Sequence, residues 1–354
     1  RKFIILWLVA LSLQLPHFFA CSIVLLAVVA FSGATHDIAT DGVYMTELSK
    51  PDQAKYIGWQ GAFYNIAKIV ASGGLVYLAG WLVKHFGGVE GASGEVMYEA
   101  NVHAWMIVMF IMAAVMILLG LYHTRMLPSG GAAATEATSF AETFNKLVEV
   151  ILDFFKKKHI WYYIAFIILY RFAEGFVMKI VPLFLKAGRE IGGLGLSEQE
   201  IGIYYGTYGA AAFVLGSLLA GYYISHRGLK RTLFSLCCIF NLPFMAYTLL
   251  AIYQPTNGML IGGAIVLEYF GYGFGFVGLT LFMMQQVAPG KHQMAHYAFA
   301  SGIMNLGVML PGMVSGFVSD WLGYRDFFIF ILFATIPAFL ITYFVPFTYP
   351  DAKK

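Results

Sequence analysis

The run HAWMIVMFIMAAVMILLGLY, residues 103–122, contains no Asp, Glu, Lys or Arg. A helix of about 20 predominantly apolar residues is long enough to cross the hydrocarbon core of a bilayer. The whole 354-residue chain has this character, because 60% of it is hydrophobic and only 12% is charged, against roughly 25% charged residues in soluble domains. The composition therefore predicts an all-α membrane protein. It excludes a soluble enzyme, a nucleic-acid-binding module and a disordered chain.

Ten predominantly apolar segments follow one another along the chain, and they are too long for tilted β-strands of about 10 residues. With residue 1 placed in the cytoplasm, fifteen Lys and Arg residues of the loops fall on the cytoplasmic side and four on the other. By the positive-inside rule, both ends of the chain are expected to face the cytoplasm. The segments cover residues 2–15, 17–47, 57–83, 103–125, 159–187, 198–225, 229–253, 258–288, 293–320 and 324–347.

The connection of residues 126–158 separates four of these segments from six. It begins with a stretch rich in Gly and Ala and continues with apolar residues at helical spacing. The second part is interpreted as an amphipathic helix lying on the bilayer surface, with a merely solvated linker as the alternative. We therefore expect an N-terminal half of residues 1–125, a cytoplasmic linker of residues 126–158 and a six-helix C-terminal half of residues 159–354. The apolar positions are Phe140, Phe144, Leu147, Val148, Ile151 and Phe155.

A short pattern recurs near the ends of the third, sixth and ninth segments. It consists of Gly, six other residues and Gly, at 80–87, 221–228 and 316–323. The first glycine would allow close helix crossing and the second a tight turn. A recurrence at every third segment indicates three-helix units, and two further helices in front would complete four such units. Two halves built from inverted three-helix repeats are the architecture of major facilitator transporters. We therefore expect ten of the twelve transmembrane helices of that fold, with the first two lacking.

Several stretches resemble known sequences of this superfamily. Residues 221–231 resemble its cytoplasmic loop signature and keep Gly221, Gly228, Lys230 and Arg231. Residues 32–44, SGATHDIATDGVY, resemble the fourth helix of AmpG-type muropeptide permeases and their acetyl-coenzyme A transporter-like relatives. Residues 153–178, the glycine-rich stretch after Glu268 and residues 294–299 are similar to later parts of the same family.

The resemblance implies proton-coupled import of a muropeptide-like sugar-peptide across a bacterial inner membrane by alternating access. Asn65 stands near a position where the family often carries Arg, and this departure bears on the substrate. The alternatives are symport of another solute (a sugar, a nucleoside, an oligopeptide or a coenzyme A ester), a non-transporting membrane sensor and an intramembrane hydrolase.

Charged side chains within the spans predict a polar interior, because each would cost about 2.5–3.5 kcal/mol at the bilayer centre. Glu174 and Glu268 are proton-coupling candidates. Arg171 lies three residues before Glu174 and can pair with it, so a purely structural ion pair is the alternative role. Asp37 and Asp41 share one helix face and either contact protons or substrate or form a latch to a basic loop.

Other polar side chains in the spans could bind a sugar or peptide, and helix packing is the alternative for each. No nucleophilic triad, Cys metal spacing or nucleotide-binding glycine loop is present in the sequence, so we expect no enzyme, no cofactor and no metal. The expected partners are a small-molecule substrate, protons and the lipid bilayer, without nucleic acid, for a monomeric protein. The substrate-binding candidates are Asn65, Lys68, Tyr64, Tyr170, Arg171, Lys179, Tyr269, Gln285 and Asn305.

Overall fold

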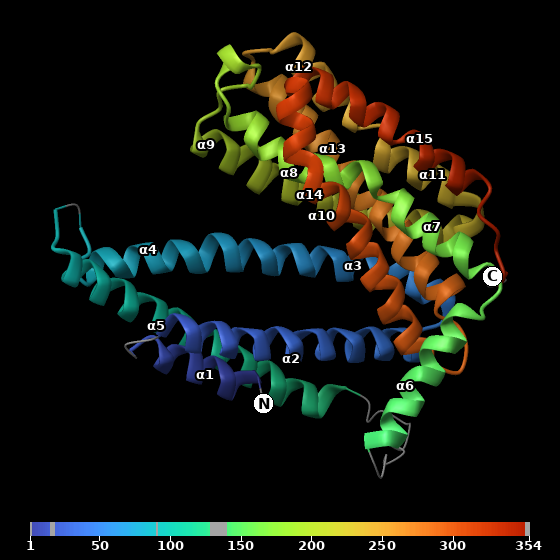
Figure 1. Cartoon of the computed structure of the whole chain (residues 1–354), viewed down its shortest axis with the longest axis horizontal. Helices are drawn as coiled ribbons and strands as arrows, with labels where there is room; N and C mark the ends of the chain where they lie inside the picture. The colour runs from blue at the N-terminus through green and yellow to red at the C-terminus, as the bar shows by residue number, and fades with distance from the viewer. Residues whose placement is uncertain (1, 15–17, 90, 128–139, 351–354) are drawn as a thin grey trace. The chain divides into compact units, whose positions relative to one another are not determined.

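The computed structural model describes residues 2–14, 18–89, 91–127 and 140–350, and within these ranges it contains helices and turns but no strand (Figure 1). The chain divides into two compact units. The first comprises residues 1–43 and 67–136, and the second comprises residues 44–66 and 137–354. The all-helical class predicted from composition is confirmed for the described residues.

In the first unit, the long helix α5 packs against α1 and α4 (Figure 1). The contact positions of α5 are small, since Ala100, Ala104 and Ala113 are buried, and small residues let helix backbones approach closely. The Trp7 and Phe110 rings meet edge to face with their centroids 5.5 Å apart. The helices whose residues contribute to this unit are α1 (Lys2–Ser12), α2 (Phe18–Glu47), α3 (Lys50–Ile69), the π-helix η1 (Val70–Leu75), α4 (Val76–His85) and α5 (Gly94–Met126).

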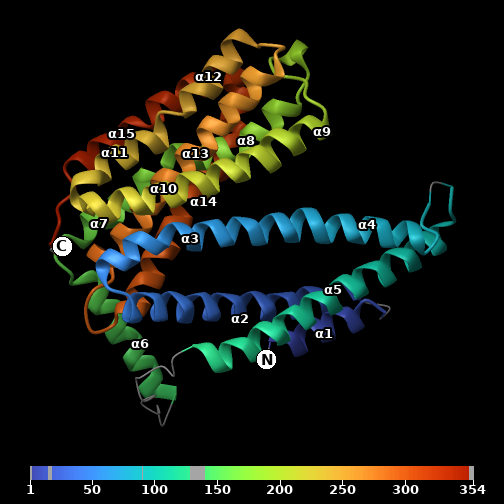
Figure 2. The ribbon, with the colours of Figure 1, turned by 180° about the vertical axis from the view of Figure 1, so that it is seen from behind.

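The second unit holds the remaining helices together with the end of α2 and most of α3 (Figure 2). Three long helical segments of this unit are interrupted. The interruptions lie at Arg171 between α7 and α8, at Pro243 between α11 and α12, and at Gly323 within α14. Its helices are α6 (Phe140–Phe155), α7 (Ile160–Tyr170), α8 (Phe172–Lys186), η2 (Arg189–Ile191), α9 (Glu198–Ile201), η3 (Gly202–Tyr208), α10 (Gly209–Arg227), α11 (Leu229–Asn241), α12 (Phe244–Tyr253), α13 (Gly258–Phe282), η4 (Met283–Val287), α14 (Gln293–Ala334) and α15 (Ile336–Tyr343).

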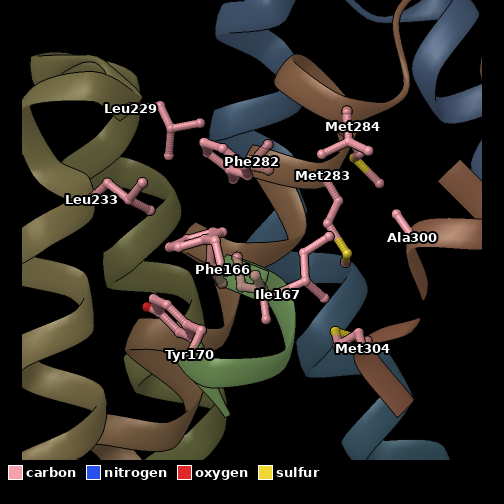
Figure 3. Packing of buried hydrophobic residues seen from close by; sticks show 14 of the residues in the cluster. Phe166, Ile167, Tyr170, Leu229, Leu233, Phe282, Met283, Met284, Ala300 and Met304 are labelled. Atoms are coloured by element: carbon pink, nitrogen blue, oxygen red, sulfur yellow. The ribbon is translucent and has the colours of Figure 1, made fainter. Parts of the chain in front are cut away.

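A large apolar cluster fixes α7 against α13, η4 and α14 in the second unit (Figure 3). Phe166 packs on Phe282 with a ring-centroid distance of 4.6 Å, and both side chains are fully buried. Met283 and Met304 close the other side of the cluster. Between membrane-spanning helices such contacts stabilise the bundle through close van der Waals packing, so this cluster holds together the helices that carry the charged interior residues.

The glycines of α13 serve helix packing. A Cβ atom at Gly273 would lie 2.2 Å from the Phe213 carbonyl oxygen of α10, and one at Gly271 would lie 2.3 Å from the Ile239 carbonyl oxygen of α11. On the facing helix α10, a Cβ atom at Gly216 would lie 2.3 Å from the carbonyl oxygen of Phe270. Only glycine fits at these positions, so α13 owes its close contact with both neighbours to them.

The structure tests both predictions made from the recurring Gly-x6-Gly pattern: the turn at the second glycine and the close helix crossing at the first. Gly87, Gly228 and Gly323 all have positive φ, at 87°, 82° and 73°, so the predicted turn at the second glycine is confirmed in all three copies. The expectation of close helix crossing at the first glycine holds for Gly221 but was wrong as a general rule. A Cβ atom at Gly80 or Gly316 would meet no described atom of another helix within 4 Å.

Among the described residues, six helices are long and apolar enough to span a membrane. The predicted ten of twelve transmembrane helices stays a prediction, because several apolar segments are divided into shorter helices and α1 has only 11 residues. The amphipathic helix predicted in the linker is present as α6, whereas its contact with a bilayer is untested. The spans are residues 19–47, 94–126, 202–227, 229–253, 258–287 and 293–343.

Candidate functional site

A buried ion pair lies at the interruption between helices α7 and α8. The backbone of Arg171 leaves the helical conformation at φ −106° and ψ 9°, so α7 ends and α8 begins there, with Glu174 in the first turn of α8. Arg171 Nε donates to Glu174 Oε2 at 2.5 Å, and Arg171 Nη2 donates to Glu174 Oε1 at 2.6 Å. The side chains are 6% and 3% exposed, so this bidentate pair neutralises both charges inside the helix bundle. The pairing predicted from the three-residue spacing is confirmed.

Contacts on three sides fix the position of this pair. The guanidinium carbon of Arg171 lies 5.1 Å from the ring centroid of Phe276 on α13. The Tyr170 hydroxyl is fully buried and donates to the Gly275 carbonyl oxygen at 2.8 Å. On α14, the Val308 carbonyl oxygen would be only 2.6 Å from a Cβ atom at Gly175, so α8 and α14 are in backbone contact there. Tyr170, a predicted substrate contact, therefore holds α7 to α13.

Glu268 of α13 is buried in a different environment. It is 8% exposed, and its Oε2 atom accepts a hydrogen bond of 3.1 Å from the fully buried Tyr247 hydroxyl of α12. Within the described part of the chain, no Lys, Arg or His forms an ion pair with it. A carboxyl group with a hydroxyl partner can take up a proton without breaking an ion pair.

An aromatic group borders Glu268. The half-buried Tyr269 ring meets the Tyr205 ring of η3 edge to face at 5.0 Å. A Cβ atom at Gly209 would be only 3.0 Å from the Tyr269 ring, so the start of α10 is in contact with that side chain. The sequence predicted Tyr269 as a binding candidate but gave no signal for Tyr205 or Tyr247, because their partners lie on other helices.

The other predicted binding residues of the second unit do not join this group. Lys179 is exposed, and its stem lies against Gly312 of α14. Gln285 is 6% exposed and donates at 3.4 Å to the backbone carbonyl oxygen of Lys50. Asn305 is exposed. Tyr64 is 71% exposed, and the amide of Asn65 donates to the Gly61 carbonyl oxygen at 2.9 Å.

The aspartates of α2 belong to the first unit. Asp37 is exposed and Asp41 is half-buried. The neighbouring His36 ring stacks on His123 of α5 at a centroid distance of 6.1 Å. The side chain of Lys68 lies outside the described residues.

Sequence reasoning missed a close contact between α3 and α10. A Cβ atom at Gly58 would lie 2.3 Å from the Ser217 carbonyl oxygen, and the Ser217 hydroxyl donates to the Gly58 carbonyl oxygen at 3.2 Å. One turn along, a Cβ atom at Gly221 would be 2.8 Å from the Ala54 carbonyl oxygen. The small residues four apart on each helix were the available signal. We call this contact, made by Ala54, Gly58, Gly61, Ser217 and Gly221, the α3–α10 contact.

The loop signature of residues 221–231 forms a tight corner. Gly228 ends α10 with its positive φ, and α11 begins at Leu229, which is buried. Lys230 Nζ lies 6.0 Å from the ring centroid of Phe347, and Arg231 is exposed. Both cations therefore lie in the first turn of α11, and Lys230 is beside the C-terminal segment.

A lysine connects the linker to the end of α13. Lys157 Nζ donates to the carbonyl oxygens of Val287, Ala288 and Pro289 at 2.7, 3.0 and 2.6 Å. These carbonyls belong to the last residue of the π-helix η4 and the two residues after it, where no further helical turn binds them, so the ammonium group caps them. Burial lowers the pKa of Lys157 to about 8, with the nearby Asp153 acting in the opposite direction.

Comparison with known proteins gives a consistent result. The sequence model of the Major Facilitator Superfamily matches residues 3–288 and 192–354. The anhydromuropeptide permease of Escherichia coli K12 is 24% identical over 318 residues, which cover 90% of this chain and 58% of that protein. "Putative transporter AmpG 2" of Rickettsia typhi is 24% identical over 216 residues, covering 58% of this chain and 48% of that protein.

A solved structure is also similar. The fucose:proton symporter FucP of E. coli superposes with a TM-score of 0.64 at 15% sequence identity, covering 97% of this chain and 82% of that chain. This likeness concerns the fold. The chain spans less than two thirds of the length of the curated relatives that it matches, 58% in the case of the E. coli permease.

Proposed function

The chain belongs to the Major Facilitator Superfamily, and from this premise we propose that it is a secondary transporter rather than an enzyme. The proposed activity is proton-coupled import of a muropeptide-like sugar-peptide by alternating access. The similarity to the E. coli anhydromuropeptide permease over 90% of the chain supports this substrate class. The proposed location is a bacterial inner membrane, with both chain ends in the cytoplasm and with helices corresponding to the third to twelfth of the twelve-helix fold.

The observation that carries the coupling proposal is the difference between the two buried glutamates. Glu174 is bound by Arg171 through two short hydrogen bonds, so a proton arriving there must displace an arginine. Glu268 accepts a single hydrogen bond from Tyr247. Protonation of Glu268 removes a buried negative charge without leaving a cation unpaired. We therefore assign the transported proton to Glu268 and the fixed charge pair to Arg171 and Glu174.

Alternating access requires a contact that forms and breaks in each transport cycle, and the α3–α10 contact has the required character. It is made of backbone and small side chains, so it can separate without exposing large apolar groups. Lys50 and Lys55 begin α3 and Arg227 ends α10, which places cations at this end of both helices. Under the positive-inside rule this end faces the cytoplasm, and we propose that the contact is a cytoplasmic gate.

Uptake of radiolabelled anhydro-muropeptide by the full-length protein in proteoliposomes tests the proposal, with and without an imposed proton gradient. Wild-type protein should accumulate substrate only with the gradient. Glu268→Gln should bind substrate but lose gradient-driven accumulation, whereas the neutral pair Arg171→Met, Glu174→Leu should keep the pH dependence of any remaining uptake. Unchanged pH-dependent uptake in a Glu174→Gln, Glu268→Gln double variant would contradict the coupling assignment.

The same assay separates the alternatives. Competition by a free sugar, a nucleoside, an oligopeptide or a coenzyme A ester identifies another solute. Asn65 is the residue that favours such an outcome, because its amide is neutral and already bonded to the backbone of Gly61. Ligand binding without flux would identify a membrane sensor.

A further inference from the structure

A second group of titratable side chains lies away from the buried glutamates, where the linker helix α6 meets the start of α14. Glu149 and Asp153 are four residues apart on α6 and share one face of that helix. His292 is the N-terminal cap residue of α14. The His292 Nε2 atom lies 3.8 Å from Glu149 Oε1 and 3.6 Å from Asp153 Oδ2, and the three ligand atoms lie within 4.8 Å of one another.

These separations fit the coordination sphere of a small metal ion. Bonds of about 2.0–2.1 Å in a tetrahedral zinc site place neighbouring ligand atoms roughly 3.3–3.4 Å apart. The observed distances to the His292 nitrogen exceed this spacing by a few tenths of an ångström, which rotation of two carboxylate side chains can supply. The donor set also selects the ion, since imidazole suits zinc and its first-row neighbours, whereas magnesium and calcium prefer oxygen ligands alone.

The state of the histidine nitrogen supports a ligand role. His292 Nε2 is shielded from solvent and has no hydrogen-bond partner among the described atoms, although two carboxylates are nearby. A shielded nitrogen without a partner is costly unless something binds it. A metal ion between this nitrogen and the two carboxylates would satisfy all three groups.

Lys291 and Lys157 are two described cations near these carboxylates. Lys291 Nζ lies 2.7 Å from Glu149 Oε1, and this contact lowers the pKa of the Glu149 carboxyl. The Lys291 side chain is 71% exposed, so it can leave Glu149 and enter water when a cation of higher charge arrives. The ammonium group of Lys157 donates its hydrogen bonds to three backbone carbonyl groups instead of to Glu149 or Asp153.

We infer that Glu149, Asp153 and His292 form a binding site for a divalent first-row transition metal ion of the zinc class, with water in the remaining coordination position. The site goes beyond the proposed transport function, because neither glutamate of the helix interior takes part in it. A bound ion would join the linker helix α6 to the connection between α13 and α14. Glu149 and Asp153 are far from His292 in sequence, which explains why no metal-binding spacing was readable.

Calorimetric titration of the purified full-length protein with Zn²⁺ tests this inference, using an affinity tag free of histidine. We expect one equivalent of zinc to bind. His292→Ala should weaken the affinity at least tenfold, and Glu149→Gln and Asp153→Asn should each weaken it. His226→Ala, which removes an exposed histidine on α10, is the matched control and should bind like the wild type.

Lys291→Ala gives the sharper discrimination. If Lys291 competes with the metal for Glu149, its removal should tighten zinc binding severalfold. Thermal unfolding of each variant without zinc establishes that it is folded, and Co²⁺ absorption in the visible region reports the coordination number independently. Absence of zinc binding in the wild type, equal binding in His292→Ala, or weaker binding in Lys291→Ala would each overturn the inference.

Discussion

The substitution Gly58→Ala should lock the transporter out of the state in which α3 and α10 touch. The added Cβ atom would lie 2.3 Å from the Ser217 carbonyl oxygen and 2.8 Å from the Leu218 Cα atom. Both are backbone atoms, so no side-chain rotation can relieve the clash. An ordinary contact needs about 3.4 Å or more, so the helices must separate locally by about 1 Å. That separation breaks the 3.2 Å hydrogen bond from the Ser217 hydroxyl to the Gly58 carbonyl oxygen.

The magnitude follows from these two effects. Overpacking of a close contact costs about 1–3 kcal/mol. Loss of the hydrogen bond adds about 1 kcal/mol. The state with the α3–α10 contact is therefore destabilised by about 2–4 kcal/mol, and since 1.4 kcal/mol corresponds to a factor of ten, its population falls roughly 30-fold or more. If each transport cycle passes through this state, uptake should fall by at least tenfold.

Two measurements check this prediction in the full-length protein. The first is uptake in proteoliposomes, with Gly263→Ala as the matched control, because a Cβ atom at Gly263 of α13 would meet no described atom within 4 Å. The second is disulfide formation between Gly61→Cys and Ser217→Cys, with the three native cysteines replaced. The Cβ position at Gly61 lies 3.7 Å from Ser217 Cβ, close to the mean separation of about 3.8 Å in disulfides. Gly58→Ala should slow this cross-link in parallel with uptake. Wild-type uptake and cross-linking in Gly58→Ala would refute the assignment of the contact as a gate.

Three further predictions concern other parts of the second unit. Arg171→Met should destabilise the protein by about 3–5 kcal/mol, because Glu174 is left as an unpaired buried charge, and thermal unfolding should show a smaller loss for Arg171→Met combined with Glu174→Leu. The pKa of Lys157 is about 8 in the folded protein against 10.5 for the free side chain, so the unfolded chain binds this proton more tightly. The free energy of unfolding should therefore rise from about pH 8 to pH 10.5, and this rise should be absent in Lys157→Met. A fluorophore on Leu152→Cys of α6 should be quenched by brominated lipids if α6 lies on the bilayer, whereas equal quenching from Lys146→Cys, on another face, would contradict that orientation.

Local features of the fold were predictable from the sequence. The helical spacing of apolar residues predicted α6, because an amphipathic helix is determined by its own residues. The second glycines of the recurring pattern were predicted as turns, because a positive φ is a local demand that glycine meets. The ion pair of Arg171 and Glu174 was predictable because its partners are only three residues apart in the sequence.

Contacts between distant segments were not predictable in the same way. Tyr247 binds Glu268, Ser217 binds Gly58 and Lys157 binds the end of η4, and in each case the partners lie in segments far apart in the sequence or on different helices. The residue types are unremarkable in sequence, because tyrosine, serine and lysine occur on many helices. Only the packing of α12 on α13, of α3 on α10 and of the linker on η4 selects these pairs.

Gly221 links the loop signature to the proposed gate. Gly221 begins the segment that ends with the turn at Gly228. Because it lacks a Cβ atom, the backbone of Ala54 on α3 can lie in close contact with it. Because α11 follows directly after Gly228, a separation of α3 from α10 acts on a helix that is joined to α11 by a single glycine. The α11 helix in turn packs against α13, which carries Glu268. Glu268 and the α3–α10 contact thus lie on helices that are linked by packing within the second unit. We propose that coupling of a proton to alternating access runs through these packed helices, which would connect the turn at Gly228 with Glu268.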